Sequence, residues 1–330
     1  MSCQAVTITT STALETLLDV ETMAAQLRAL LPSPELSLHT ATLVDHKPGH
    51  RAVVHYRGSE SGRTVSVYGK AYPERTRAAR AYELMRTLSQ EVFAGAPGVR
   101  VPRPVAFDPD LALVLYTPVV GVPLDRLAPT TELFAALGDA ARWLATLHGC
   151  RLPLDRTLDL SHETANAHLW ARLVATRQPS AGTAASRLTK ALQTTGLPVC
   201  VDAARPIHKD FHYGHVIVGD GVGVVDFDEL RLGDLNFDLA HFSAYLHLLS
   251  VRTGARPAER DRWVQWFLAA YSDARGWEPD ASFGWFAAYT CVKIAKQVAT
   301  GRGPQPRPAG EARAAQIDLI LRKGLAWLER

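Results

Sequence analysis

The chain has 330 residues, of which 47% are hydrophobic and 21% charged, the balance of a globular protein with enough material for two lobes or domains. The formal net charge is only +3 and no long run of Lys or Arg occurs, so nothing indicates a nucleic-acid-binding surface. No stretch approaches the roughly 20 apolar residues that span a bilayer, and the first ten residues, MSCQAVTITT, lack the basic start and apolar core of a secretion signal. We therefore expect a cytoplasmic protein with no nucleic-acid and no membrane partner.

The first third of the chain is typical of a small β-rich lobe. Residues 12–31 carry apolar side chains at helical spacing and stop at Pro32, which predicts one leading amphipathic helix. The pattern then changes to short alternating or β-branched segments, separated by the turn sequences KPGH and GSESG, which predicts an antiparallel meander. The strands expected in this lobe are 36–46, 51–57, 64–70 and 112–117, with a helix at 74–90 between the last two.

From residue 118 onwards the apolar period changes to about 3.6, as in residues 132–148, where Leu133, Leu137 and Leu144 share one face. The second part should therefore be mostly helical, and we predict a boundary between lobes 1–117 and 118–330. One stretch, 199–234, departs from the helical pattern, and GRGPQPRPAG at 301–310 is expected to be an exposed loop. Further helices are expected at 162–177, 184–195, 235–251, 258–275, 282–300 and 311–328.

The non-helical stretch contains Asp220-Gly221 between the apolar runs VIVG and VGVV, a strong signal for a tight β-hairpin. A hairpin brings its open ends together, so Asp210 and His215, before the first strand, should lie near Asp226, after the second. Phosphoryl transfer needs one carboxylate to receive or orient the acceptor hydroxyl and a second to hold the magnesium ion on the nucleotide phosphates. Asp210 suits the first role and Asp226 the second.

The residues around this hairpin also resemble a known signature. It consists of His208-Lys209-Asp210, Val225-Asp226-Phe227-Asp228 and GDLNFDLA at 233–240. Together these look like the motifs of the aminoglycoside phosphotransferase family, which shares the protein-kinase-like fold with choline and sugar kinases. The resemblance implies an α+β, two-lobed fold with a small β-rich N-lobe and a larger, mostly helical C-lobe. It also implies that Asp210 is the catalytic base, that His208 braces the catalytic loop, that Asp226 binds magnesium, and that Asp234 and Asp238 are buried acids holding the loops together.

One position departs from the family pattern. Members generally carry Asn five residues after the catalytic Asp as a further metal ligand, and this chain has His215 there. Neutral imidazole can bind a divalent ion, but magnesium prefers oxygen. Three roles for His215 therefore stay open: a contact to phosphate or metal through water, no part in a site that relies on Asp226, or simple packing.

The first lobe should supply the nucleotide contacts, a cation on the phosphates and a carboxylate that holds it. Lys70 at the end of a strand and Glu83 on the next helix resemble the strand lysine and helix glutamate of the family. No G-x-G-x-x-G occurs, and the turn between the first two strands is KPGHR at 47–51. There Gly49 would let backbone N–H groups approach phosphate and Arg51 would add charge, unless the segment is a plain hairpin turn.

The acceptor site is expected among the helices after Asp238. Residues 245–330 hold 13 Lys or Arg against 8 Asp or Glu, which favours a neutral, zwitterionic or anionic acceptor over a polycation. We therefore predict a small-molecule kinase, monomeric or homodimeric, that transfers the γ-phosphoryl group of Mg²⁺-bound ATP or GTP to a hydroxyl of a small metabolite or antibiotic.

Two alternatives remain open. His215 and the missing glycine-rich loop would fit a nucleotide-binding pseudokinase. His208-x-Asp210 could instead belong to a two-His, one-carboxylate iron site of an oxygenase, although the helical second lobe and the hairpin argue against this. The histidines that could complete such an iron site are His212, His241 and His247.

Overall fold

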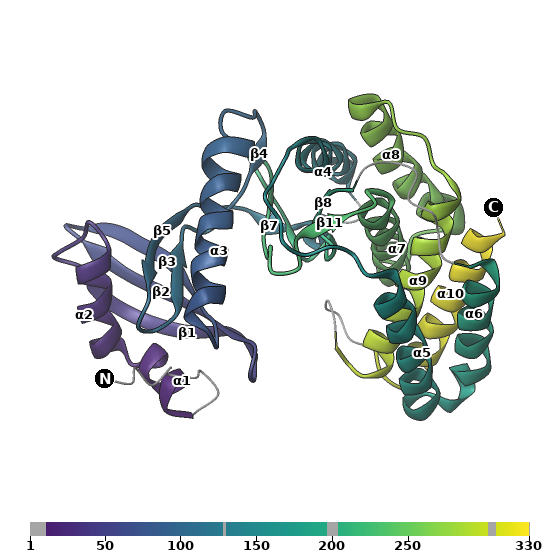
Figure 1. Ribbon diagram of the computed structural model, residues 1–330, viewed down its shortest axis with the longest axis horizontal. Helices are drawn as coiled ribbons and strands as arrows, with labels where there is room; N and C mark the ends of the chain where they lie inside the picture. Colours follow the sequence, from purple (N-terminus) through teal and green to yellow (C-terminus); the bar gives the residue numbers. More distant parts are fainter. Residues whose placement is uncertain (1–10, 128–129, 197–203, 303–307, 330) are drawn as a thin grey trace. The chain divides into compact units, whose positions relative to one another are not determined.

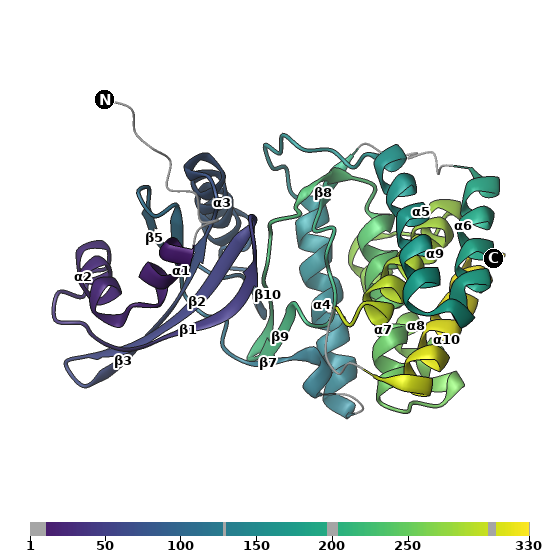
Figure 2. The same ribbon diagram turned by 90° about the horizontal axis from the view of Figure 1, so that it is seen from below.

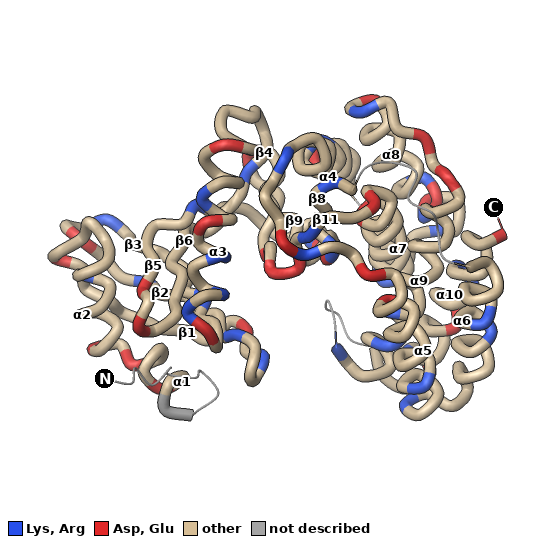
Figure 3. Tube along the Cα trace, in the orientation of Figure 1, with Lys and Arg blue, Asp and Glu red and all other residues tan. Residues whose placement is uncertain are grey.

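The computed structural model describes residues 11–127, 130–196, 204–302 and 308–329 (Figure 1). Contacts within the chain divide it into two units, Met1–Val120 and Gly121–Arg330. In the described parts, no helix is long and apolar enough to cross a membrane. Figure 3 shows basic and acidic residues interspersed along both units, in agreement with the small net charge.

The first unit is built on a five-stranded antiparallel sheet in the order β1-β2-β3-β6-β5, with helix α3 packed on β5 and β6 (Figure 1). The predicted meander is confirmed, since β1 pairs with β2 and β2 with β3, both antiparallel. The strands of this unit are β1 (Ser37–Lys47), β2 (Arg51–Glu60), β3 (Arg63–Ala71), β4 (Val99–Arg100), β5 (Pro104–Asp108) and β6 (Leu113–Tyr116), and α3 (Arg75–Thr87) continues into a π-helical turn, Leu88–Val92.

The prediction of a single leading helix was wrong, because two helices occur there, α1 (Ser11–Leu18) and α2 (Val20–Leu30). Asp19 separates them: its backbone is extended, and its side chain accepts a hydrogen bond from the Thr22 N–H at 2.8 Å. An aspartate in this position satisfies an amide that the first turn of a helix leaves unpaired, so it starts α2 instead of continuing α1.

The second unit is mostly helical, and the helices expected from the apolar period are confirmed to within a few residues. Helix α7 is buried on almost every side, which makes it the centre of the unit. Figure 2 shows α5, α6, α9 and α10 side by side, and these helices pack on one another. Residues 303–307 of the loop predicted at 301–310 lie outside the described residues. The helices are α4 (Thr131–Gly149), α5 (Leu160–Arg177), α6 (Gly182–Thr195), α7 (Asn236–Arg252), α8 (Pro257–Arg275), α9 (Ala281–Ala299) and α10 (Gly310–Leu328).

The predicted hairpin interrupts this helical unit. It consists of β9 (Val216–Gly219) and β10 (Gly221–Val224), paired antiparallel with Gly219 opposite Gly221, so that Asp220 alone forms the tip. Gly221 has φ +87°, a conformation in which glycine carries no steric penalty. Short strands complete the unit: β7 (Val122–Pro123) pairs with β9, and β8 (Arg205–Ile207) pairs with β11 (Arg231–Gly233).

Candidate active site

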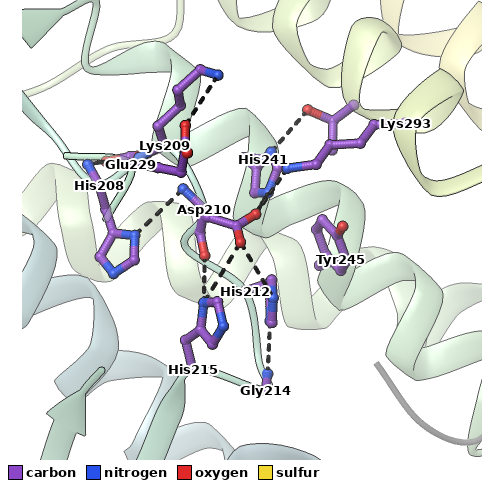
Figure 4. A network of polar contacts seen from close by, with 12 residues as sticks. His208, Lys209, Asp210, His212, Gly214, His215, Glu229, His241, Tyr245 and Lys293 are labelled. Carbon is purple, nitrogen blue, oxygen red and sulfur yellow. Dashed lines mark hydrogen bonds and ion pairs between the residues drawn. The ribbon is translucent and has the colours of Figure 1, made fainter. Parts of the chain in front are cut away.

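Asp210 lies at the centre of a cluster of basic side chains (Figure 4). Its Oδ1 atom is 2.8 Å from Nζ of Lys293 on α9 and 3.6 Å from Nε2 of His241 on α7. Its Oδ2 atom faces the loop side of the cluster, 3.9 Å from Nε2 of His212 and 4.0 Å from Nδ1 of His215. Both carboxylate oxygens therefore face potential hydrogen-bond donors, contributed by two helices and the loop that carries Asp210.

This environment determines the protonation state of the cluster. Burial raises the pKa of Asp210, but the Lys293 ammonium, together with the nearby His241, His212 and His215 rings, outweighs it and holds that pKa well below its usual range. Burial also lowers the pKa of His241 to about 4, and, together with the neighbouring His215, lowers the pKa of His212 well below its usual value. At neutral pH, Asp210 is therefore a carboxylate beside neutral imidazoles, suited to accept a hydrogen bond from an alcohol.

The histidine ring of His215 lies between the two acidic residues of the hairpin ends. Its Nδ1 atom is 2.9 Å from the Asp210 carbonyl oxygen, and its Nε2 atom is 3.8 Å from Oδ2 of Asp226. The strand pairing explains this placement, because the Val225 N–H donates to the His215 carbonyl at 3.1 Å and so continues the hairpin to its open end. The hairpin thus brings Asp210 and Asp226 to either side of one imidazole, as expected from the sequence.

A buried tryptophan packs against the residues that follow both acidic positions. The Trp143 ring of α4 stacks on Phe211 with centroids 5.7 Å apart and on Phe227 with centroids 6.2 Å apart. These phenylalanines directly follow Asp210 and Asp226. The apolar core therefore fixes the backbone at both acidic positions, while their carboxylates stay partly accessible, 28% and 17% exposed.

Asp238 anchors the loop that carries Asp210. The carboxylate is fully buried, and it accepts hydrogen bonds from the backbone N–H groups of His208 at 2.6 Å and Lys209 at 2.7 Å. Nε2 of His148 lies 3.2 Å from the same group. Burial alone would raise the pKa of Asp238. Hydrogen bonding to His148 and the surrounding donors lowers this pKa by more than burial raises it, so the pKa of Asp238 lies below its usual value. The geometry agrees with the loop-holding role expected from the sequence.

The ring of His208 links the two acidic positions. Its Nε2 lies 3.3 Å from the Val225 carbonyl and therefore donates, while its Nδ1 accepts from the Asp210 N–H at 3.4 Å. One imidazole thus connects the loop that carries Asp210 to the residue just before Asp226. Because both nitrogens are engaged within the protein, His208 has none left for iron, which argues against the oxygenase alternative.

Asp234 differs from the expectation of a buried acid. It is only partly buried, and its Oδ1 accepts a hydrogen bond from the Asn236 N–H at 2.8 Å, at the start of α7. It therefore holds the first turn of the helix that carries Asp238.

Two supporting residues were not assigned by sequence reasoning. Lys209 has φ +65°, and its ammonium lies 2.8 Å from Oε1 of buried Glu163, which also accepts a hydrogen bond from the Tyr289 hydroxyl. Lys293, on α9, pairs with Asp210 as described above. A sequence signal existed for Lys293, since it lies on α9 among mostly buried residues and a buried charge requires a partner. Lys209 lies in a loop, where no such periodic signal exists.

In the first unit, Lys70 and Glu83 have the expected positions on a strand and a helix. Lys70 is buried near the end of β3, with its ammonium 5.7 Å from the centroid of the Tyr72 ring. The Glu83 carboxylate is 59% exposed and lies 2.8 Å from Nε of Arg86, one turn further along α3. The pairing of Lys70 with Glu83 stays a prediction.

The KPGH segment forms the hairpin turn between β1 and β2. Gly49 has φ +72°, and the His50 N–H donates to the Lys47 carbonyl at 2.9 Å. Nε of Arg51 lies 3.0 Å from Oδ2 of Asp45 across the hairpin. These contacts describe a well-formed turn, and the phosphate-binding role of Gly49 and Arg51 stays a prediction.

Comparison with known proteins decides the family. A family model described as the phosphotransferase enzyme family (APH) matches residues 50–281, well over half of the chain. The chain belongs to this phosphotransferase family. The predicted resemblance is thereby confirmed, together with the predicted class of enzyme, a small-molecule phosphotransferase with an alcohol group as acceptor. No curated protein matches the sequence closely enough to count as a relative.

Solved structures confirm the protein-kinase-like fold of this phosphotransferase. Spectinomycin phosphotransferase APH(9)-Ia, in complex with ADP and spectinomycin, is 13% identical with a TM-score of 0.62, over 94% of this chain and 98% of that one. Amicoumacin kinase hAmiN, in complex with AMP-PNP, Ca²⁺ and Ami, is 16% identical with a TM-score of 0.60, over 96% of each chain. Choline kinase from Cryptosporidium parvum Iowa II is 9% identical with a TM-score of 0.60, over 94% of this chain and 96% of that one.

Replacement of Lys293 should change the pH dependence of the phosphotransferase. Lys293→Met removes the cation that lowers the pKa of Asp210, so that pKa rises. Since the carboxylate is lost as pH falls through its pKa, the acid limb of the pH profile of kcat/KM should move to higher pH. The profile can be followed by ADP release with an accepted acceptor.

A matched control is Lys296→Met on the same helix, because the Lys296 ammonium lies over the Trp170 ring, 5.0 Å from its centroid. We expect the acid limb of Lys296→Met to lie at the same pH as in wild type. The acid limb of Lys293→Arg, which retains the positive charge, should lie close to it. An acid limb that stays in place in Lys293→Met would show that Asp210 is not the group that titrates.

Proposed function

We propose that this phosphotransferase transfers the γ-phosphoryl group of a magnesium-bound nucleoside triphosphate to a hydroxyl of a small metabolite or antibiotic. The main support is the pair of carboxylates on either side of His215, with Asp210 Oδ2 4.0 Å from Nδ1 and Asp226 Oδ2 3.8 Å from Nε2. One carboxylate would orient the acceptor hydroxyl and receive its proton, and the other would hold the metal ion. Bound at Asp226, that ion would offset charge on the phosphates.

Each predicted site residue has a role in this proposal. Asp210 is the catalytic base, positioned by His208, and Asp234 and Asp238 hold the surrounding backbone. The metal ligands are Asp226 and His215. The nucleotide contacts belong to a lobe formed by residues 1–117, and the acceptor site belongs to residues 118–330. The nucleotide-binding residues are Lys70, Glu83, Gly49 and Arg51.

The donor nucleotide is proposed to be ATP, with GTP as the alternative. In support, solved structures of the same fold contain ADP in spectinomycin phosphotransferase and AMP-PNP with Ca²⁺ in amicoumacin kinase. A nucleoside triphosphate donor would also place the enzyme in the cytoplasm.

The acceptor is proposed to be neutral, zwitterionic or anionic near its reacting hydroxyl. The Lys293 ammonium lies 2.8 Å from Asp210 Oδ1 and so already occupies the cationic position beside the catalytic carboxylate. An ammonium group of the acceptor about 4 Å from Lys293 would be repelled by roughly 4 kcal/mol at an effective dielectric constant of 20. This disfavours a polycationic acceptor whose charge lies close to the hydroxyl.

The metal role of Asp226 can be tested by binding. We expect MgATP and MgADP to raise the melting temperature of the wild-type protein, because a ligand at 100 times its Kd stabilises the folded state by about 2.7 kcal/mol. Asp226→Ala should lose the part of this shift that depends on the metal and keep any shift that the nucleotide alone produces. Differential scanning fluorimetry with and without a chelator measures both parts.

Asp220→Asn is the matched control, because Asp220 is an exposed acid at the opposite end of the same hairpin. It should behave as wild type. A metal-dependent shift that survives in Asp226→Ala would contradict the assigned role, and nucleotide binding without turnover of any hydroxylated acceptor would favour the pseudokinase alternative.

A further inference from the structure

The His215 ring presents a lone pair to the Asp226 carboxylate. The Asp210 carbonyl oxygen, 2.9 Å from Nδ1, can only accept a hydrogen bond, so Nδ1 carries the ring hydrogen. Nε2 is then the unprotonated nitrogen, and it lies 3.8 Å from Oδ2 of Asp226. This separation is too long for a hydrogen bond, but it is shorter than two metal–ligand bonds of about 2.1 Å end to end, so one cation can contact both atoms.

His212 lies equally close to Asp210 but is not equivalent to His215. Ligand atoms of Asp210, His212 and His215 all lie within 4.8 Å of one another, which suggests a metal site at first sight. The Gly214 N–H, however, donates to Nδ1 of His212 at 3.0 Å, so this ring carries its hydrogen on Nε2, the nitrogen that faces Asp210. A protonated ring nitrogen cannot bind a metal, and Asp210 Oδ1 is already paired with Lys293. The cation position is therefore between His215 and Asp226.

The backbone holds Asp226 in the conformation that aims it at His215. Asp226 has φ +68°, a left-handed conformation that costs a non-glycine residue about 1–3 kcal/mol. The preceding residue, Val225, is fixed on both sides: its N–H donates to the His215 carbonyl at 3.1 Å, and its carbonyl faces Nε2 of His208 at 3.3 Å. The surrounding structure thus imposes the strain at a position where the carboxylate meets the imidazole.

We propose that Nε2 of His215 is a direct ligand of the active-site cation together with Asp226, and that it gives the site a preference for borderline transition ions such as Co²⁺ or Zn²⁺ over Mg²⁺. The inference rests on the proposed function, which places a divalent ion at Asp226. Imidazole nitrogen suits first-row transition ions, whereas Mg²⁺ binds oxygen ligands and retains water. One nitrogen ligand therefore changes the order of preference and still lets Mg²⁺ bind through Asp226.

The test compares metal preference in the wild-type protein and in His215→Asn, which replaces the imidazole by an amide with an oxygen ligand. Full-length protein with ADP is titrated with MnCl₂, with free Mn²⁺ counted by electron paramagnetic resonance, and bound Mn²⁺ is then displaced by MgCl₂ or CoCl₂. The wild-type site should hold Co²⁺ against a large excess of Mg²⁺. His215→Asn should reduce the preference for Co²⁺ over Mg²⁺ by roughly tenfold or more, since even residues that only support a ligand change metal affinity by 10–100-fold.

His212→Asn is the matched control, because it makes the same change three residues away in the same loop. It should leave the metal preference unchanged. Equal preferences in wild type and His215→Asn, or the same loss in His212→Asn, would overturn the proposal. If the wild-type protein with ADP binds no divalent ion at all, the proposed function fails together with this proposal. If it binds a divalent ion without the expected preference, only this proposal fails.

A second measurement needs no substitution and applies even if His215→Asn does not fold. In protein labelled with ¹⁵N-histidine and loaded with ZnCl₂ and ADP, the Nε2 resonance of His215 should move to the position of a metal-bound nitrogen, and its Nδ1 should stay protonated. The His212 resonances should keep the pattern of a ring protonated on Nε2. An unmoved His215 Nε2 resonance in the zinc-loaded protein would contradict direct ligation.

Discussion

Asp210→Asn should reduce phosphoryl transfer by about three to four orders of magnitude, near the upper limit for the loss of a general base. The amide has nearly the same shape as the carboxylate but cannot take up the proton of the acceptor hydroxyl. Nucleotide binding should be almost unchanged, because the metal ion is assigned to Asp226. The measurements are kcat by ADP release and nucleotide affinity by calorimetry. Full turnover in Asp210→Asn would refute the assignment of the base.

A structural effect of this substitution has to be separated from the chemical one. Asp210→Asn leaves the Lys293 ammonium, 18% exposed, without the carboxylate that lies 2.8 Å away, so the melting temperature should fall. The double variant Asp210→Asn with Lys293→Gln removes both charges and should recover most of the lost stability. Turnover should not recover with it. A double variant that regains activity would mean that the single variant is inactive because it is misfolded.

The parts of the site that could be predicted are those determined by residues close together in the sequence. Asp220-Gly221 between two apolar runs predicts the hairpin, and the hairpin by itself brings Asp226 close to His215. The helices follow from the apolar period of about 3.6, which is also a local signal. The motif from His208 to Asp238 then supplied the expected roles, because its residues are close in sequence or joined by the hairpin.

The contacts that could not be predicted join residues far apart in the chain. Lys293 pairs with Asp210 across 83 positions, and Tyr289 donates to Glu163 across 126. A buried charge indicates that a partner exists but not which one, since the choice depends on how the helices pack. The break at Asp19 was missed for a different reason: the apolar period continues through it, while the cap interrupts the backbone.

Asp238→Ala should have the largest effect on stability. Its carboxylate is fully buried and is bound by the N–H groups of His208 and Lys209 and by His148. Removing one partner of such a buried charged network leaves the others unpaired and costs about 3–5 kcal/mol in the free energy of unfolding. Urea denaturation measures this loss. Asp234→Ala is the matched control, because Asp234 is only partly buried and starts the same helix, so its loss should cost about 0.5–2 kcal/mol.

The pH dependence of the free energy of unfolding gives an independent check that Asp238 acts through its charge. The pKa of Asp238 is lowered in the folded protein, despite the opposing effect of burial, because His148 and the neighbouring donors favour the carboxylate. A group with a depressed pKa contributes stability that is fully present above its unfolded pKa and is lost as pH falls through its folded pKa. The stability difference between wild type and Asp238→Ala should therefore be constant near neutral pH and shrink in acid. A difference that stays the same down to pH values where wild type unfolds would mean that Asp238 holds the catalytic loop through packing and not through its charge.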